Sequence, residues 1–216
     1  MDPEGRILLI TLEGIDGSGK STLHLALKGL LADLDPLFTR EPGATWVGES
    51  VRRAIAEQID PVTEATLFVA DHAAHLAQVI RPALREGKLV ISDRYSDSRY
   101  AYQAVTLKGV IQNPEEWLRA MHDGWSIVPD RTFLCVLPVD EALARLKPSN
   151  EREHFEKRDV LEKVQENYFK FARAEPSRFV IVDALKDKDE IAQFVADAIR
   201  LQFKTGKGRR KQHKKK

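Results

Sequence analysis

The chain has 216 residues, of which 43% are hydrophobic and 31% charged, a composition typical of one globular domain. No apolar run approaches the roughly 20 residues that a membrane helix needs, and the acidic start at 1–4 is unlike a signal peptide, so we expect a cytoplasmic protein. The single cysteine, Cys135, excludes an internal disulfide and a cysteine-based metal site, and its apolar neighbours predict a buried position.

The net charge of +1 conceals a strong asymmetry along the chain. Residues 204–216 hold 8 of the 34 lysines and arginines and none of the 33 acidic residues, which leaves 26 basic against 33 acidic residues, a net −7, on the rest. We therefore predict one domain over 1–203 and a disordered basic tail over 204–216. We expect this tail to act as a solubilising extension, and the alternative is a weak, salt-sensitive attraction to nucleic acid or other polyanions.

In chain order, apolar segments of strand length alternate with segments of helical periodicity. Strands are expected at 6–12, 36–40, 88–92, 131–137 and 178–182. Helices are expected at 20–34, 47–58, 63–85, 96–107, 114–124, 139–146, about 158–173 and 189–203. This alternation predicts an α/β fold with a five-stranded, mainly parallel sheet and helices on both faces. The charged segment 145–158 is expected to be a flexible lid on this single domain.

A phosphate-binding loop lies between the first strand and the first helix. Its pattern G-x-x-x-x-G-K-[ST] is formed by Gly14, Ile15, Asp16, Gly17, Ser18, Gly19, Lys20 and Ser21, with Thr22 following. The glycines allow a tight turn whose N–H groups, with those of the helix start, point at phosphate oxygens. Lys20 supplies positive charge to the β- and γ-phosphates, and the Ser21 hydroxyl can reach Mg²⁺. The loop predicts binding of a nucleoside triphosphate.

The loop alone does not say what is done with the triphosphate. Switch GTPases share it but read guanine with N-K-x-D, which this chain lacks. Arg40 and Arg94 each end a predicted strand, at the sheet edge where open α/β folds bind ligands. Phosphoryl transfer to an acceptor that is itself an anion needs cations there, so the arginines favour a kinase over a binding module. Asp93 closes a strand where a carboxylate would bind Mg²⁺.

Further motifs resemble the thymidylate (dTMP) kinase family, in the order that the family has them. After the loop come T-R-E-P-G at 39–43, L-F-V-A-D at 67–71, I-R-P-A-L at 80–84, S-D-R-Y at 92–95, D-S at 97–98 and A-Y-Q at 101–103. The resemblance implies a P-loop kinase fold, transfer of the γ-phosphoryl group of ATP to dTMP with Mg²⁺, and a homodimer. The helix at 63–85 is the part from which the dimer face is expected.

The resemblance also implies roles for individual residues. Arg40 and Arg94 would hold the monophosphate, and Asp16 would bind the 3′-hydroxyl of the acceptor. Phe68 would stack on the base, although its place on a helix alone favours a core position. The other residues expected near the nucleoside are His72, Ser98, Tyr102 and Gln103, of which Tyr102 would crowd the 2′ side of the sugar.

Two positions depart from the family pattern. Family members commonly have an arginine at the position of His72, where it bonds a base carbonyl, so dUMP or a broader pyrimidine set stays open as the acceptor. We interpret the nearby His75 as a surface residue of the helix. Some relatives place a catalytic arginine at the position of Gly17, and others supply that cation from the lid. We therefore expect a catalytic cation from the lid, with Arg152 favoured over Arg145.

Overall fold

The computed structural model describes residues 8–146 and 153–213, with side chains up to Phe203. Five parallel strands form one sheet in the order β2-β3-β1-β4-β5. Their bounds are β1 Leu9–Glu13, β2 Leu37–Arg40, β3 Val90–Asp93, β4 Arg131–Val136 and β5 Phe179–Asp183. The predicted α/β fold and number of strands are confirmed, and every pairing is parallel.

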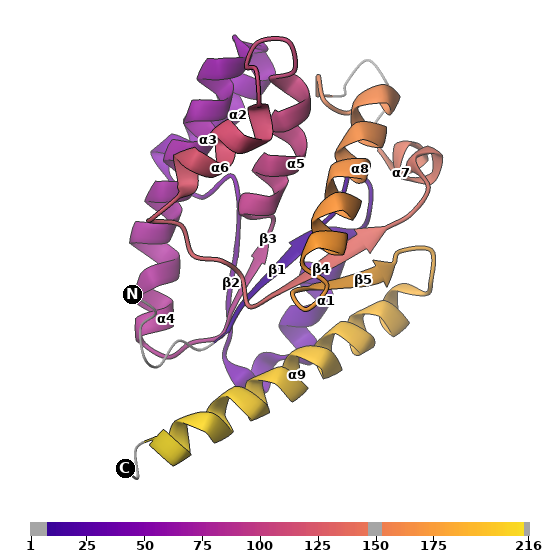
Figure 1. Ribbon diagram of the computed structural model, residues 1–216. Helices are drawn as coiled ribbons and strands as arrows, with labels where there is room; N and C mark the ends of the chain where they lie inside the picture. Colours follow the sequence, from indigo (N-terminus) through magenta and orange to yellow (C-terminus); the bar gives the residue numbers. More distant parts are fainter. Residues whose placement is uncertain (1–7, 147–152, 214–216) are drawn as a thin grey trace.

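Helices cover both faces of this sheet (Figure 1). Figure 1 shows α1 and α9 on one face and α5 and α8 on the other, and α1 packs against α9 as α5 packs against α8. The helices are α1 Lys20–Leu30, the 3-10 turn η1 Ala32–Leu34, α2 Trp46–Glu57, α3 Pro61–His75, α5 Ser96–Thr106, α6 Pro114–His122, α7 Val139–Arg145, α8 Arg158–Ala174 and α9 Lys188–His213.

The strand positions explain why the sheet edge gathers polar groups. β1 and β3 are buried along their whole length, as strands covered on both faces must be. Arg40 pairs in register with Asp93, which in turn pairs with Leu12 of β1. The carboxyl ends of β1, β2 and β3 therefore meet at one edge, and the loops that follow them meet there too.

The helix predicted over 63–85 is interrupted. α3 ends at His75, a π-helical turn η2 runs over Leu76–Ile80, and α4 spans Arg81–Arg85. Pro82 lies in the first turn of α4 and has no N–H, while its ring crowds the carbonyl four residues earlier. The wider turn removes this conflict without ending the helical direction.

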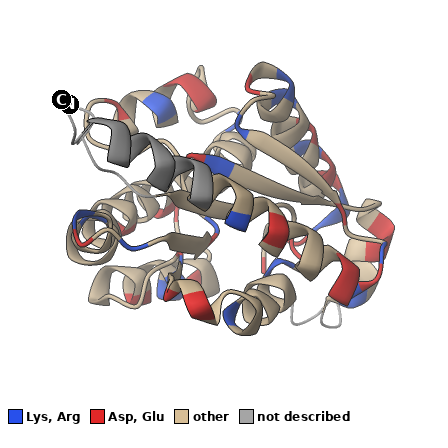
Figure 2. Cartoon of the chain, turned by 90° about the horizontal axis from the view of Figure 1, so that it is seen from below, with Lys and Arg blue, Asp and Glu red and all other residues tan. Residues whose placement is uncertain are grey.

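The last helix extends further than predicted. We expected it to end at residue 203, but α9 is helical through His213. The added segment has no proline to stop the helix and is rich in lysine and arginine, which are good helix formers, although Gly206 and Gly208 are poor ones. Arg200 ties α9 to η1 through an ion pair with Asp33 at 2.6 Å. On this side of the molecule the basic and acidic residues are interspersed (Figure 2).

Candidate active site

The phosphate loop begins where β1 ends and finishes at the first residue of α1. Gly14 has φ 139° and Gly17 has φ 78°, conformations that favour glycine. A Cβ on Gly14 would lie 2.4 Å from the carbonyl oxygen of Cys135, and one on Gly17 would lie 2.2 Å from that of Ala142. The loop thus packs directly on the ends of β4 and α7. This contact gives a physical reason for the absence of a side chain at position 17.

We predict that Gly17→Ala lowers the free energy of unfolding by roughly 1–3 kcal/mol, because it adds both a left-handed strain and a backbone clash. Gly29→Ala is the matched control, since Gly29 lies inside α1 and a Cβ added to it would meet nothing within 4 Å, and alanine there should stabilise by about 0.5–1 kcal/mol. Urea denaturation of both variants measures the two values. A Gly17→Ala protein as stable as the parent would contradict the packing argument.

Lys20 is buried under the loop that it follows. Its Nζ donates to the carbonyl of Ile15 at 2.7 Å and to Oγ of Ser18 at 3.2 Å. Burial and then the charge of Arg94 lower the pKa of Lys20 to about 8. The ammonium group is therefore held in place before any phosphate arrives, and an incoming polyanion would favour its charged form.

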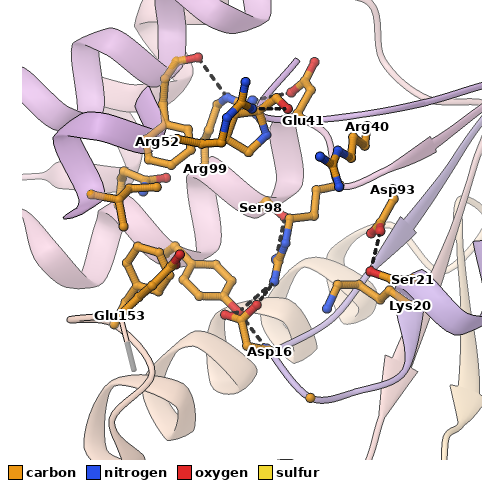
Figure 3. Close-up of a pocket in the computed structure, with 18 of the residues that line it drawn as sticks. Asp16, Lys20, Ser21, Arg40, Glu41, Arg52, Asp93, Ser98, Arg99 and Glu153 are labelled. Carbon is orange, nitrogen blue, oxygen red and sulfur yellow. Dashed lines mark hydrogen bonds and ion pairs between the residues drawn. The ribbon is translucent and has the colours of Figure 1, made fainter. Parts of the chain in front are cut away.

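A hydroxyl and a carboxylate lie side by side at the start of α1. Ser21 Oγ donates to Asp93 Oδ2 at 2.8 Å, which Figure 3 shows as a dashed line. Both are hard oxygen ligands of the kind that Mg²⁺ prefers, and Mg²⁺ usually takes few protein ligands and completes its shell with water and phosphate oxygens. No group of three or more histidine, cysteine, aspartate or glutamate side chains in the described part of the chain could hold a metal.

Arg94 joins the phosphate loop to α5. Its Nη1 donates to the Gly14 carbonyl at 3.3 Å and to Ser98 Oγ at 3.2 Å, and its Nη2 pairs with Asp16. The Tyr102 hydroxyl donates to Asp16 at 2.7 Å, and the guanidinium lies 5.0 Å from the Tyr102 ring centroid. Burial raises the pKa of Asp16, but the charges of Arg94 and Lys20 outweigh it and lower that pKa.

These groups line one cavity of about 570 Å³. It runs from the phosphate loop, past Asp16 and Ser98, to Arg52, Arg99 and Glu153 (Figure 3). The predicted site residues that line it are Asp16, Gly17, Gly19, Lys20, Ser21, Thr22, Arg40, Phe68, Asp93, Arg94, Ser98, Tyr102, Gln103 and Arg145. The size suits a nucleotide, and the cationic lining suits its phosphates.

Some predicted residues do not line this cavity. Gly14, Ile15 and Ser18 belong to the loop behind it. Arg152 lies outside the described residues, so the structure does not compare it with Arg145. Arg145 ends α7, lines the cavity and donates to the Ala184 carbonyl at 3.3 Å.

His72 and His75 form part of a buried network around Glu41 instead. His72 Nδ1 lies 2.9 Å from Glu41 Oε1 and His75 Nδ1 lies 2.7 Å from the same oxygen. The other ring nitrogens bond to Ser126 at 2.8 Å and Thr39 at 2.6 Å. The surface position expected for His75 is wrong, because its ring is fully buried, and His72 faces the core rather than the cavity.

Four charged residues of the cavity wall were not predicted as site residues from the sequence, namely Glu41, Arg52, Arg99 and Glu153. Arg52 lies on α2 and donates to the carbonyls of Pro42 and Gly43 at 3.4 and 3.2 Å. Arg99 lies one helical turn before Gln103, and this spacing of four residues, which places them on one helix face, was the available signal. Glu153 lies within the charged segment 145–158, and no sequence pattern predicts which residues of that segment face the cavity.

Glu13 is a fully buried carboxylate behind Arg94. It accepts from the N–H of Tyr95 at 2.8 Å, from Ser98 Oγ at 2.5 Å and from the Tyr168 hydroxyl at 2.8 Å. Burial and then the charge of Asp97 raise the pKa of Glu13 from 4.5 to about 7. The charged form therefore weighs against folding above that pH.

This raised pKa predicts a pH-dependent difference in stability between the parent protein and Glu13→Gln. The folded state binds the Glu13 proton more tightly than the unfolded state, so the free energy of unfolding of the parent falls between pH 4.5 and about 7. The fall is about 3 kcal/mol and the variant lacks it. Urea denaturation of both proteins across pH 4.5 to 8 measures the difference. Parallel stability curves would contradict it.

The fold and the phosphate loop beside the cavity together define a class, the P-loop kinases. A family model described as thymidylate kinase matches residues 12–195. The chain belongs to the thymidylate kinase family, whose members transfer the γ-phosphoryl group of ATP to dTMP to give dTDP. In the described residues, no helix combines the length and the apolar character needed to span a membrane.

Curated relatives agree with this assignment over most of their length. A probable thymidylate kinase of Methanoculleus marisnigri is 68% identical over 193 residues, which are 89% of this chain and 94% of the relative. Those of Methanospirillum hungatei and Methanocorpusculum labreanum are 56% and 54% identical over 196 and 193 residues. These alignments cover 91% and 89% of this chain and 95% and 98% of the relatives.

Proposed function

We propose that the chain phosphorylates dTMP with ATP inside the 570 Å³ cavity, with the two nucleotides meeting beside Arg94. The observation that carries this is the position of Arg94, which bonds the phosphate loop through Gly14 and Asp16 and also reaches Ser98 on α5. One cation thus lies between the triphosphate side and the acceptor side. Two anions can be brought together only where such charge separates them.

On the donor side, we propose that the N–H groups of the loop and the Lys20 side chain bind the β- and γ-phosphates of ATP. Ser21 and Asp93 would hold Mg²⁺, directly or through water, since their oxygens lie 2.8 Å apart at the start of α1. When bound, the metal would neutralise charge on the β- and γ-phosphates. The protein's own part is to hold the phosphates in line with the acceptor and to exclude water.

On the acceptor side, we propose that Arg40 and Arg94 bind the monophosphate. The nucleoside would occupy the half of the cavity that lies away from the phosphate loop. Arg40 is exposed at the end of β2 and, in the described chain, has no hydrogen bond or ion pair from its side chain, so its guanidinium is available to a phosphate. Phe68, which lines the cavity from α3, supports base stacking. Asp16 and Tyr102 would contact the sugar.

The lid would add a further cation at the moving phosphoryl group, because position 17 of the loop is a glycine and supplies none. Arg152→Met should lower kcat by roughly 10²-fold or more and change either KM little, since such a cation acts mainly in the transition state. Arg145→Met is the competing variant, because Arg145 lines the cavity. Steady-state kinetics of both decide the role: an unchanged kcat for Arg152→Met with a large loss for Arg145→Met would assign it to Arg145.

Two further properties are proposals. A homodimer through α3 and its neighbour α2 is supported by Trp46 of α2, whose side chain is 74% exposed, and sedimentation equilibrium tests it. The basic residues 204–216 would attract polyanions weakly, and the affinity for heparin or DNA should fall steeply with salt. Neither property is needed for phosphoryl transfer.

The acceptor is tested by ADP release measured with dTMP, dUMP, dCMP, dGMP or no acceptor. The proposal expects release that depends on the acceptor and is fastest with dTMP. Equal release with and without an acceptor would favour a nucleotide-hydrolysing regulatory module. Faster release with dUMP than with dTMP would keep the kinase and overturn the preference for thymine.

A further inference from the structure

Arg99 of α5 lies where the cavity reaches Phe68. Its Nε donates to the Phe68 carbonyl at 3.2 Å, its Nη1 donates to the Tyr95 carbonyl at 2.6 Å, and its Nη2 pairs with Glu41. The guanidinium carbon is 5.8 Å from the centroid of the Phe68 ring. The side chain is 2% exposed, yet it forms part of the cavity wall, as Figure 3 shows. Arg99 therefore borders the space that a ring on Phe68 would fill.

His72 cannot contact a ring stacked on Phe68 in the way that Arg99 can. Both ring nitrogens of His72 are engaged, one with Glu41 and the other with Ser126. Burial lowers the pKa of His72, and its side chain has no part in the cavity wall. The cation beside Phe68 comes from α5 instead of α3.

Arg99 has donors left to offer. A guanidinium carries five N–H groups, and the three contacts with described residues occupy three of them, leaving one on each Nη. Gln103 lies one turn further along α5, lines the same cavity, and its amide has no hydrogen bond to a described residue. A donor pair and an adaptable amide thus face the cavity from one helix face.

Glu41 makes a buried arginine possible at this position. Arg99 and Glu41 are both nearly inaccessible to solvent, and an isolated charge there would be strongly unfavourable. Burial raises the pKa of Glu41, but the charges of Arg99 and His72 outweigh it and hold that pKa well below its usual range. The pair is therefore ionised and rigid, so the guanidinium is already oriented before a nucleotide binds.

We propose that Arg99 is a specificity-determining residue, which donates to the 4-carbonyl of the pyrimidine while Gln103 accepts from the ring N3–H. A 4-oxo pyrimidine offers this acceptor and donor, whereas cytosine presents a donor at position 4 and an acceptor at N3. Arg99 therefore selects thymine or uracil against cytosine. This inference rests on the proposal that the base lies on Phe68, and it assigns to α5 the contact that His72 was expected to make.

The test is the ratio of kcat/KM for dTMP to that for the 5′-monophosphate of 4-thiothymidine, whose sulfur is a weak acceptor. The parent should prefer dTMP, and Arg99→Met should lose about tenfold or more of that preference, as expected for a charged hydrogen bond. The ratio for dTMP over dCMP should fall in the same variant. A loss of kcat/KM by the same factor for all three acceptors would show a purely structural role and overturn the proposal.

Three further variants remove the remaining ambiguity. Should Arg99→Met fold poorly because Glu41 is left charged, the pair Glu41→Gln with Arg99→Met carries the same test. His72→Gln should keep the preference for dTMP over the thio analogue. If His72→Gln lost this preference while Arg99→Met kept it, the proposal would be overturned. Phe68→Leu should weaken all acceptors equally. If Phe68→Leu left kcat/KM unchanged for every acceptor while Arg99→Met lost the preference for dTMP, the stacking proposal would be rejected and the role of Arg99 supported.

Discussion

Lys20→Ala should lower kcat for phosphoryl transfer by about 10²–10³-fold or more, the loss typical when one oriented charge is removed from a transition state. The reason lies in how the side chain is held. Its Nζ is fixed by the Ile15 carbonyl at 2.7 Å and Ser18 at 3.2 Å, so no reorganisation is needed when charge moves from the γ-phosphate. Another flexible lysine cannot replace it.

The fold should survive this substitution. The Ile15 carbonyl also accepts from the Ser18 N–H at 3.2 Å, so removing the lysine leaves that carbonyl bonded. Lys28→Ala is the matched control, because Lys28 lies on the same helix with an exposed side chain. Coupled ADP release gives the rates and circular dichroism the melting temperatures. A Lys20→Ala protein with the turnover of Lys28→Ala would contradict the assigned role.

Arg94→Met should lower kcat/KM for dTMP by roughly 10³-fold, with a large part of the loss in kcat. This arginine bonds the Gly14 carbonyl, Asp16 and Ser98 at once, so in the proposed reaction it would position the loop and the acceptor relative to each other as well as bind an anion. It also adopts φ 66°, a backbone conformation that is uncommon outside glycine and that aims its side chain across the site.

Arg40→Met provides the comparison for this prediction. Arg40 is exposed and makes no bond that orients its side chain among the described residues, so its loss should raise KM for dTMP by roughly tenfold and change kcat less. Asp16→Asn combined with Arg94→Met removes the carboxylate that the single variant leaves unpaired. Steady-state kinetics of the four proteins measures the effects, and equal losses for Arg40 and Arg94 would contradict the distinction between them.

The position of the phosphate loop between β1 and α1 could be predicted from the sequence. A local motif spans eight consecutive positions and specifies four of them, Gly14, Gly19, Lys20 and Ser21, for reasons of backbone geometry, charge and metal binding. Arg40 and Arg94 could be paired because both follow strands, and parallel strands end at one edge. The base half was harder. Whether a helix residue such as His72 faces a cavity or the core depends on packing between helices, which periodicity on a helix that is apolar on most sides does not reveal.

The buried network around Glu41 could not be predicted from the sequence either. Glu41, His75 and Arg99 lie far apart in sequence, and each reads alone as an ordinary surface residue. Their burial becomes favourable only when all three are together, so no single position carries the signal. The π-helical turn at Leu76–Ile80 likewise depends on Pro82, which lies inside the single helix that we predicted over 63–85.

The order of strands in the sheet has a consequence for how this protein is made. β1 pairs with β3, about eighty residues later, and with β4, about 120 residues later. β2 also pairs with β3, which follows it in the chain. During synthesis, no strand of this sheet can therefore find a neighbour until nearly half of the chain has been made. Such non-local pairing slows folding. The emerging chain carries a complete phosphate loop for this whole interval without the sheet edge that gives the loop its shape.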